Sequence, residues 1–322
     1  MNARVSMADV AAAAGVSGQT VSRVVNGSPR VDPATRARVE SAMASLGYRP
    51  HRAARALRTG RTDTIGLIVS TLASVGNSRM LQAIADAASA RGFALTVVTA
   101  AGGDAVAHGF TQLRDQGVDG AIVLNEATAA ARAVSAPEGL ALVVVDSPPD
   151  DRYTIVQTDH AAGASAATRH LLSLDRGAVW HLAGPAGSFA AAERERGWRE
   201  AMRDAAVPPP RVLRGDWTAA SGYLAARELP ADARALFVAN DQMALGALRA
   251  LAERDLRIPE DVAVVGFDDV ADAADYRPPL STVRQDFDAL GAAAVDALVT
   301  RIGNAPAPSV LLTPTLVLRA SS

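Results

Sequence analysis

The sequence has 322 residues, 49% of them apolar and 20% charged, which is enough for two or three domains with buried cores. No apolar run approaches the roughly 20 residues that span a bilayer, which excludes a membrane-spanning protein. Cys is absent, which excludes disulfides, thiolate metal sites and cysteine nucleophiles and is typical of the reducing cytoplasm.

The net charge of -2 conceals a strong asymmetry along the chain. Residues 1–61 contain ten arginines and three acidic residues, whereas the remainder contains more acidic than basic residues. A small basic segment joined to a larger acidic one predicts an anionic partner, such as nucleic acid, for the basic part.

The N-terminal 50 residues predict three short helices. Residues 6–9, SMAD, have the form of a capping box that begins the first helix. After a glycine break, Ser17 can cap a second helix over residues 18–25, and Asp-Pro at residues 32–33 begins a third. Two short helices joined by a tight turn are typical of a helix-turn-helix, so residues 1–50 are expected to form an all-α DNA-binding domain.

The second predicted helix carries the candidate base contacts. Gln19 and Arg23 lie four residues apart on one side of it, and in a major groove Gln can pair with adenine and Arg with guanine. Short polar side chains around them suit phosphate oxygens, which fix the register without reading the sequence. The other candidate DNA contacts of this domain are Ser6, Ser17, Gly18, Thr20, Ser22 and Asn26. A solvated polar helix face is the alternative interpretation.

Residues 50–61 place four arginines at a spacing of three around a single large apolar residue, Leu57. In a minor groove, Leu57 can wedge between base steps while Arg55 and its neighbours neutralise phosphates. A charged linker is the alternative interpretation.

Residues 5–62, from MADVAAAAGVS to RAARALRTGRT, resemble the DNA-binding domain and hinge of the LacI/GalR family of bacterial transcription regulators. The resemblance implies a recognition helix over residues 17–26 and a hinge helix over residues 51–62. It also implies that Leu57 of each subunit intercalates at the centre of a pseudo-palindromic operator. Gly18 departs from the large aromatic residue that a member of the family carries at this position.

From residue 64, short β-branched runs alternate with amphipathic helical stretches, a pattern typical of parallel sheets covered by helices. The runs form two sets, which the segment 153–160 separates. We therefore expect residues 63–322 to form two α/β lobes with a cleft between them. The predicted strands are residues 64–69, 94–99, 120–124 and 141–145 in the first lobe, and 178–182, 236–239 and 262–266 in the second.

Polar residues follow these runs with regularity. Because ligands bind beyond the carboxyl ends of strands in open α/β sheets, Ser70, Asp146 and Asn240 are expected at a ligand site. Asp268 follows another run, and Arg194 lies on a helix after the run at 178–182. Such groups beside aromatic rings suit a sugar, whose hydroxyls need paired polar partners and whose C–H face packs on a ring. For any one strand-end residue, a helix N-cap is the alternative role.

The family resemblance continues to about residue 320, with LAGP at 182–185, RERGW at 194–198, VANDQMALGA at 238–247, VVGFDD at 264–269 and PPLSTVRQDF at 278–287. It implies a periplasmic-binding-protein-like fold of two parallel-sheet lobes, with chain crossings near residues 160, 285 and 313. It favours a galactoside effector, contacted by Ser70, Asp146, Arg194, Trp217, Asn240, Asp268, Gln285 and Phe287. The wall that meets an aglycone falls on residues 72–80, where the departures from the family pattern are Ser74, Val75, Gly76 and Met80.

Other classes of function fit the sequence less well. The histidines form no metal-spaced pair, and no GxSxG elbow or P-loop is present, so we expect no enzyme, metal or other cofactor. A secreted sugar receptor is also disfavoured, because Asp9 interrupts the apolar stretch that would serve as its signal peptide. The sequence stops at Ser322 with no leucine heptad beyond it, so we expect a homodimer rather than a tetramer. The protein is thus expected to be a cytoplasmic repressor that binds operator DNA and a small sugar. The alternative is a related regulator that responds to a different sugar or a nucleobase.

Overall fold

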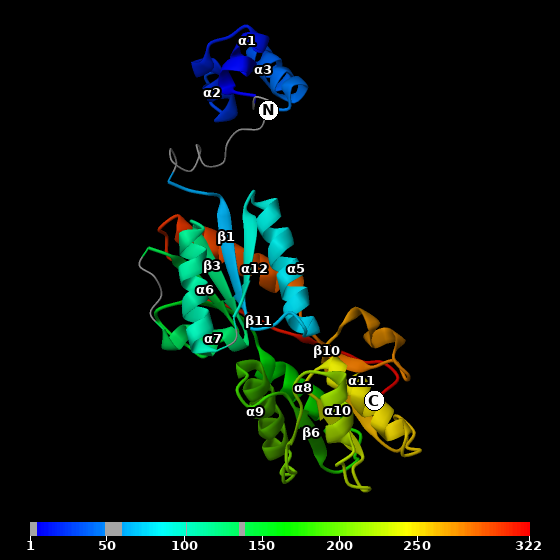
Figure 1. The fold of residues 1–322 in the computed structure, drawn as a ribbon. Helices are drawn as coiled ribbons and strands as arrows, with labels where there is room; N and C mark the ends of the chain where they lie inside the picture. The colour runs from blue at the N-terminus through cyan, green and yellow to red at the C-terminus, as the bar shows by residue number, and fades with distance from the viewer. Residues whose placement is uncertain (1–4, 49–59, 101, 135–138) are drawn as a thin grey trace. The chain divides into compact units, whose positions relative to one another are not determined.

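The computed structural model describes residues 5–48, 60–100, 102–134 and 139–322. The chain divides into two compact units, residues 1–62 and residues 63–322, which are described separately (Figure 1). Most of the predicted hinge helix falls on residues 49–59, so Arg55 and Leu57 lie outside the described residues.

The N-terminal unit contains three helices, α1 (Met7–Ala14), α2 (Gly18–Val25) and α3 (Pro33–Leu46). Side chains cap them: Ser6 and Asp9 form a capping box on α1, and the Ser17 hydroxyl accepts the Thr20 amide of α2 at 3.1 Å. The small core contains Val10, Ala14, Val21, Val24 and Val39. The predicted helix-turn-helix is therefore confirmed.

The first lobe of residues 63–322 is built on a parallel sheet with strand order β11-β5-β4-β3-β1-β2. Its strands are β1 (Thr64–Val69), β2 (Ala94–Thr99), β3 (Gly120–Leu124), β4 (Ala141–Val145), β5 (Thr154–Thr158) and β11 (Val310–Leu312). Its helices are α5 (Val75–Ala90), α6 (Gly103–Asp115), α7 (Glu126–Ala133) and α12 (Phe287–Ile302). Because side chains alternate along a strand, Leu67 packs with residues of α5 and α12, whereas Ile68 packs with residues of α6 and α7.

The second lobe is built on a sheet with strand order β12-β10-β9-β8-β6-β7, in which only β12 pairs antiparallel among the described strands. Its strands are β6 (Val179–Ala183), β7 (Leu213–Arg214), β8 (Ala235–Val238), β9 (Ala263–Asp268), β10 (Ser281–Arg284) and β12 (Thr315–Val317). Its helices are α8 (His160–Leu172), α9 (Phe189–Asp204), α10 (Ala219–Ala226), α11 (Asp241–Ala252) and the 3-10 helix η1 (Ala271–Asp275).

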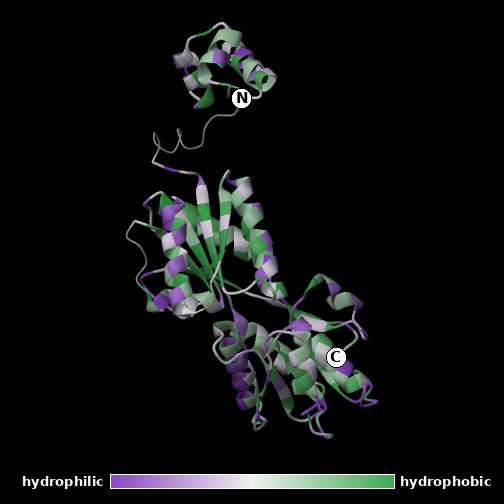
Figure 2. Cartoon of the chain, in the orientation of Figure 1, coloured by the Kyte–Doolittle hydropathy of each residue, from purple (hydrophilic) through white to green (hydrophobic). Residues whose placement is uncertain are grey.

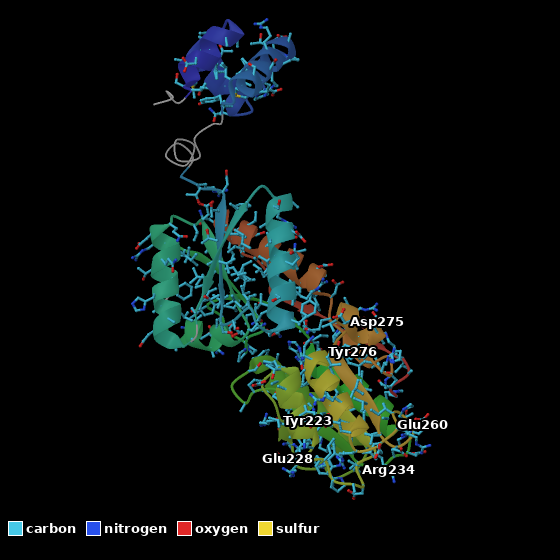
Figure 3. The ribbon with its side chains drawn as sticks, turned by 45° about the vertical axis from the view of Figure 1, so that its right-hand side comes forward. Tyr223, Glu228, Arg234, Glu260, Asp275 and Tyr276 are labelled. Atoms are coloured by element: carbon cyan, nitrogen blue, oxygen red, sulfur yellow. The ribbon has the colours of Figure 1, made fainter. Side chains whose placement is uncertain are left out.

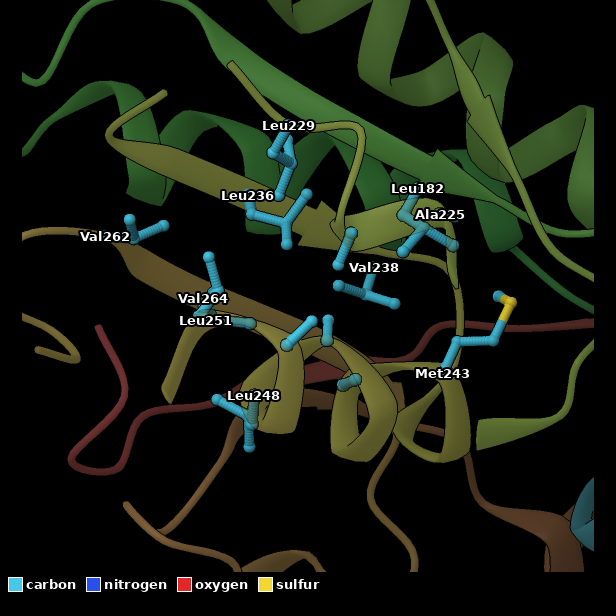
Figure 4. Packing of buried hydrophobic residues seen from close by; sticks show 14 of the residues in the cluster. Leu182, Ala225, Leu229, Leu236, Val238, Met243, Leu248, Leu251, Val262 and Val264 are labelled. Atoms are coloured by element: carbon cyan, nitrogen blue, oxygen red, sulfur yellow. The ribbon is translucent and has the colours of Figure 1, made fainter. Parts of the chain in front are cut away.

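Apolar side chains fill both faces of the second sheet. Leu236 and Val238 pack against α10 and α11, as Figure 4 shows for part of this cluster, whereas Phe237 packs against α8 and α9. The strands are accordingly hydrophobic and the outer faces of the helices hydrophilic (Figure 2). Charged residues such as Glu228 and Arg234 lie on the outer surface of this lobe (Figure 3). The two-lobed α/β architecture expected from the sequence is confirmed.

The chain passes between the two sheets three times. It leaves the first sheet after Thr158, returns after Arg284 and leaves again between β11 and β12. Helix α8 lies close to the last of these segments, because a Cβ added at Gly163 would lie 2.8 Å from Pro314 Cγ. The three crossings follow the ends of β5, β10 and β11. The cleft between the lobes therefore lies beside all three of them.

All seven predicted strands are present, with ends displaced by at most two residues. The segment predicted only to separate the lobes contains an additional strand, β5, and the short strands β7, β10, β11 and β12 were not predicted. These strands are short, and some pair with distant partners, as β11 does with β5. Local alternation of apolar residues therefore gives little indication of them.

His181 on β6 is fully buried, and its ring stacks on Phe237 with ring centroids 4.8 Å apart. Burial lowers the pKa of His181 to about 4, compared with about 6.5 for an unperturbed histidine. Between these values the unfolded chain binds a proton that the folded chain does not bind. The free energy of unfolding should therefore decrease as the pH falls from about 6.5 to about 4.

We expect the substitution His181→Phe to remove this contribution, which is at most about 1.4 kcal/mol per pH unit. Urea unfolding between pH 7 and pH 4.5 measures it as the difference in slope between variant and wild type. Replacement of the exposed His108 by Gln serves as the control and should leave the slope nearer to that of the wild type. Equal slopes for His181→Phe and wild type would contradict the assignment.

Candidate functional site

A cavity lies between the two lobes, beside the carboxyl ends of strands from both sheets. Asn125 and Asp146 follow β3 and β4 of the first sheet, whereas Asn240 and Asp268 lie at the ends of β8 and β9 of the second. Open parallel sheets bind ligands at this edge. The described residues that line the cavity are Ser74, Gly76, Asn77, Met80, Asn125, Asp146, Ala190, Arg194, Trp217, Asn240, Asp268, Gln285, Phe287 and Leu290.

Arg194 is the central cation of this site. It projects from α9, and only 4% of the residue is exposed. Its Nη2 lies 3.4 Å from Asp268 Oδ1, and its Nη1 donates to the carbonyl of Ala239. The guanidinium carbon lies 3.8 Å from the centroid of the Phe267 ring and 5.4 Å from that of Trp217. A buried guanidinium held by these contacts is fixed in position and orientation.

Asp268 is the carboxylate partner of this arginine and is itself buried. Gln285 Nε2 donates to Asp268 Oδ1 at 2.7 Å. Burial raises the pKa of Asp268, although the charge of Arg194 and the hydrogen bond from Gln285 act in the opposite direction. The φ of Asp268 is +116°, a conformation that non-glycine residues rarely adopt and that is typical of functional sites.

The neighbouring Asp269 is held by two ion pairs that stabilise this conformation. Arg284 Nε and Arg319 Nη2 each lie 2.6 Å from one of its carboxylate oxygens. Arg284 ends β10 directly before the second crossing, and Arg319 follows β12 after the third. Two of the crossing segments are therefore tied to the backbone that carries Asp268.

Asp241 is a further acidic residue that lies beside the site but does not line the cavity. Asp241 begins α11 and is fully buried, where it accepts hydrogen bonds from Thr282 Oγ1 at 2.6 Å and the Val270 amide at 2.9 Å. Burial and the nearby Asp268 carboxylate raise the pKa of Asp241 to about 8. This direction of shift favours the neutral carboxyl, which limits the negative charge beside the cavity.

His160 connects the polar groups of the two lobes. Its Nε2 lies 3.0 Å from Asp146 Oδ1 at the end of β4, and its Nδ1 accepts a hydrogen bond from Arg194 Nε at 3.4 Å. His160 begins α8 directly after the first crossing, and 2% of the residue is exposed. A continuous set of contacts thus runs from Asp146 in the first lobe through His160 and Arg194 to Asp268 in the second.

Trp217 supplies an aromatic face on the second-lobe side. Its φ is +75°, and its ring packs directly on the backbone at Gly184. A Cβ added at Gly184 would lie 2.7 Å from Trp217 Cζ3 and closer still to other ring atoms, so only glycine allows the ring to take this position. This explains the glycine in LAGP in physical terms.

Seven of the eight predicted effector contacts line the cavity. The exception is Ser70, which is half-buried at the end of β1 and is not among the described lining residues. Asn240 also has the alternative role considered from the sequence, because its Oδ1 accepts the Met243 amide at 3.0 Å as the N-cap of α11. Of the predicted aglycone wall at residues 72–80, Ser74, Gly76, Asn77 and Met80 line the cavity.

Sequence reasoning did not select several residues of this site, namely Asn125, Ala190, Leu290 and His160. Asn125 follows the predicted strand 120–124, so the same strand-end rule that selected Asp146 would have found it. Leu290 lies on a helix, where the spacing of apolar residues does not distinguish a lining residue from a core residue. His160 was named only as the place of a crossing.

In the N-terminal unit, α2 exposes Gln19 and Arg23 one turn apart. Gly18 begins the same helix and is also exposed. These side chains lie outside the small apolar core, as direct contact with bases requires.

The short polar residues around them have local roles in the folded unit. Ser6 and Ser17 cap α1 and α2, and Thr20 Oγ1 lies 3.0 Å from the Ser17 hydroxyl. Asn26 Nδ2 donates to the carbonyl of Ser22 at 2.6 Å. These local hydrogen bonds fix the direction of the hydroxyl groups at this surface.

Within the part of the chain that the structure describes, no three or more His, Asp or Glu residues gather as metal ligands would. No helix among the same residues is both long and apolar enough to cross a bilayer.

Comparisons with known proteins agree with this arrangement. Residues 6–51 match the family model of bacterial regulatory proteins of the lacI family, and residues 168–322 match the periplasmic binding protein-like domain. A lactose operon repressor of Escherichia coli (strain K12) is 37% identical over 305 residues, which are 92% of this chain and 84% of the relative.

Two solved structures cover 99% of the chain at 35% sequence identity. One is the lac repressor dimer bound to operator and the anti-inducer ONPF, with a TM-score of 0.87 over 99% of that chain. The other is a complex of the transcriptional regulator CelR with cellobiose, with a TM-score of 0.75 over 100% of that chain. The chain therefore belongs to the lacI family of bacterial regulatory proteins, and it is a transcription regulator rather than an enzyme.

Proposed function

We propose that the protein is a transcriptional repressor whose affinity for operator DNA is controlled by a small sugar, specifically a galactoside, bound between the two lobes. The observation that carries the proposal is the cavity at the strand ends, where buried Arg194, Asp268 and Gln285 face the aromatic ring of Trp217. Free sugar hydroxyls both donate and accept hydrogen bonds, so adjacent carboxylate and guanidinium groups are suitable partners.

The polar and apolar lining favours a sugar over a nucleobase. Asp146 and Asp268 provide carboxyl oxygens from opposite lobes, whereas Trp217 and Phe287 provide flat apolar surface for C–H groups. The galactoside is supported by the similar lactose operon repressor. A β-glucoside is the second candidate, because CelR is solved with cellobiose.

The N-terminal unit supports DNA binding through α2. We assign Gln19 and Arg23 to base edges in a major groove, and Ser6, Ser17, Gly18, Thr20, Ser22 and Asn26 to the phosphate backbone around them. The similar lac repressor binds its operator as a dimer, and we propose the same for this chain. A two-fold dimer binds a pseudo-palindromic operator, since each subunit reads one half-site.

The proposal assigns residues 1–50 to DNA binding, 51–62 to a hinge and 63–322 to sugar binding and dimerisation. In the hinge, Leu57 would wedge between base steps and Arg55 would contact phosphate. Because operator DNA lies in the bacterial cytoplasm, we place the protein there.

Replacement of Arg23 by Ala should weaken binding to the selected operator by about 1–3 kcal/mol if this side chain reads a base. Arg38→Ala removes the same charge from the exposed surface of α3 and serves as the matched control. The operator is first selected from a pool of random DNA. A competition assay then measures the ratio of the affinity for this operator to the affinity for random DNA. The ratio should fall for Arg23→Ala and hold for Arg38→Ala; an equal fall in both variants would show a contribution of charge alone.

Replacement of Gly184 by Ala should displace the Trp217 ring and weaken sugar binding roughly 3–10-fold, which corresponds to about 0.5–1.5 kcal/mol for an aromatic contact. Gly187→Ala is the matched control, because a Cβ at Gly187 has no atom within 4 Å among the described residues. Isothermal titration with methyl β-galactoside, methyl β-glucoside, ribose and adenine tests both the sugar class and the variants. Binding of adenine alone, or of none of these compounds, would contradict the proposed effector class.

A further inference from the structure

The buried carboxyl group of Asp241 has no direct contact with the cavity that would explain its place in the protein. It lies fully buried at the start of α11, directly after the lining residue Asn240. Burial of a carboxylate costs free energy unless a cation or several hydrogen-bond donors compensate the charge. The presence of this group inside the second lobe therefore needs a physical explanation.

The two carboxyl oxygens of Asp241 hold two segments of the second lobe together. Oδ1 accepts a hydrogen bond from Thr282 Oγ1 of β10 at 2.6 Å, and Oδ2 accepts the Val270 amide at 2.9 Å. Val270 follows Asp268 and Asp269 at the end of β9. The second bond therefore fixes the turn that carries the cavity residue Asp268, so a displacement of Asp241 would reach the cavity through this turn.

The turn after β9 has a backbone conformation that needs support from its surroundings. The φ of Asp268 is +116° and that of Asp269 is +55°, values that residues with a Cβ rarely adopt. The strand itself leaves space for the supporting carboxyl, because a Cβ added at Gly266 would overlap Asp241 Oδ1. Strand β9 and the first turn of α11 are thus fitted to each other around this group.

No cation forms an ion pair with Asp241 among the described residues. The charged or titratable groups that face it are Asp268, Asp269 and Tyr276. Burial raises the pKa of Tyr276 to about 12, so its hydroxyl is neutral at pH 9. Burial and the Asp268 carboxylate raise the pKa of Asp241, and Arg194 already pairs with Asp268. These surroundings favour the neutral form of the Asp241 carboxyl.

We propose that Asp241, as a neutral carboxyl group, is a positioning residue for the effector, which holds the turn at residues 268–270 in the conformation that binds sugar. The proposal rests on the proposed function, since it concerns the same cavity. Ionisation of Asp241 adds a second negative charge beside Asp268. The repulsion displaces the turn or favours protonation of Asp268, and either change weakens the contact of a sugar hydroxyl with this carboxylate.

The composition of the chain makes this titration measurable. Lys and Cys are absent from the sequence. The ordinary pKa values of His, about 6.5, and Tyr, about 10, bracket a range in which few other side chains titrate. A methyl glycoside is neutral throughout this range. A change in sugar affinity between about pH 7 and pH 9 therefore points to a buried carboxyl group of the protein.

Isothermal titration with methyl β-galactoside or methyl β-glucoside, whichever the protein binds, measures the affinity from pH 7 to pH 9.5. The sugar should bind more tightly to the protein with protonated Asp241. The association constant should therefore be highest near pH 7 and fall as the pH rises, with a midpoint within about one unit of pH 8. For one proton the fall is at most about tenfold per pH unit.

The substitution Asp241→Asn keeps an oxygen for the Val270 amide and supplies an NH2 group to Thr282 Oγ1, but it cannot ionise. We expect this variant to bind the glycoside without the fall at higher pH. At pH 7 it should bind roughly tenfold more tightly than Asp241→Ala, which loses both hydrogen bonds to the neighbouring segments. Rescue by the amide together with a flat pH profile distinguishes positioning by a neutral group from a purely structural role.

Two further variants test the assignment of the titrating group. Thr282→Val removes a donor that favours the ionised carboxylate, so it should raise the pKa of Asp241 and move the fall in affinity to higher pH. Asp104→Asn is the matched control, because Asp104 lies in the first turn of α6 on the exposed surface. The control should keep the wild-type profile. Thermal unfolding at each pH checks that the variants are folded.

Two results would overturn the positioning role while leaving the proposed function intact. One is a wild-type affinity that is constant from pH 7 to pH 9.5, and the other is an equal fall in wild type and Asp241→Asn, which would assign the titration to a different group. Binding of neither glycoside at any pH would overturn the role together with the proposed function. A fall that Asp241→Asn abolishes, Thr282→Val shifts and Asp104→Asn keeps would support it.

Discussion

The buried ion pair of Arg194 with Asp268 is the interaction on which the effector site depends. Both side chains are about 5% exposed, so each charge must be compensated inside the protein. Gln285, His160 and the Ala239 carbonyl provide this compensation from three different segments. The carboxyl ends of the second sheet are therefore fixed as a polar surface before any ligand arrives. Such preorganisation lowers the cost of ordering groups on binding, and a ligand with paired hydroxyls can use it.

The same contacts connect the site to the relative arrangement of the lobes. His160 lies directly after the first crossing and contacts Asp146 of the first lobe. Arg284 and Arg319 tie Asp269, and with it the backbone of Asp268, to the other two crossings. A ligand that contacts both lobes stabilises one arrangement of the crossings over others. If operator DNA favours a different arrangement, binding of either ligand weakens binding of the other. The coupling free energy is the same in both directions.

The sequence predicted those parts of the fold and site that depend on local pattern. Capping residues such as Ser17 gave the helices of the N-terminal unit, and the strand-end rule selected Asp146 and Asp268. The pairing of β11 with β5 joins segments about 150 residues apart, which no local pattern records. His160 was missed for a related reason, because its contacts with Asp146 and Arg194 exist only in the folded chain.

The most direct test of this account is the reciprocity of the coupling between sugar and operator. The dissociation constant of the operator is measured with and without saturating sugar, and that of the sugar with and without saturating operator. The account predicts that each ligand weakens the other by the same factor, between about 5-fold and 150-fold. The contradicting result is that sugar leaves the operator affinity unchanged and operator leaves the sugar affinity unchanged. The cavity would then not control the DNA-binding unit.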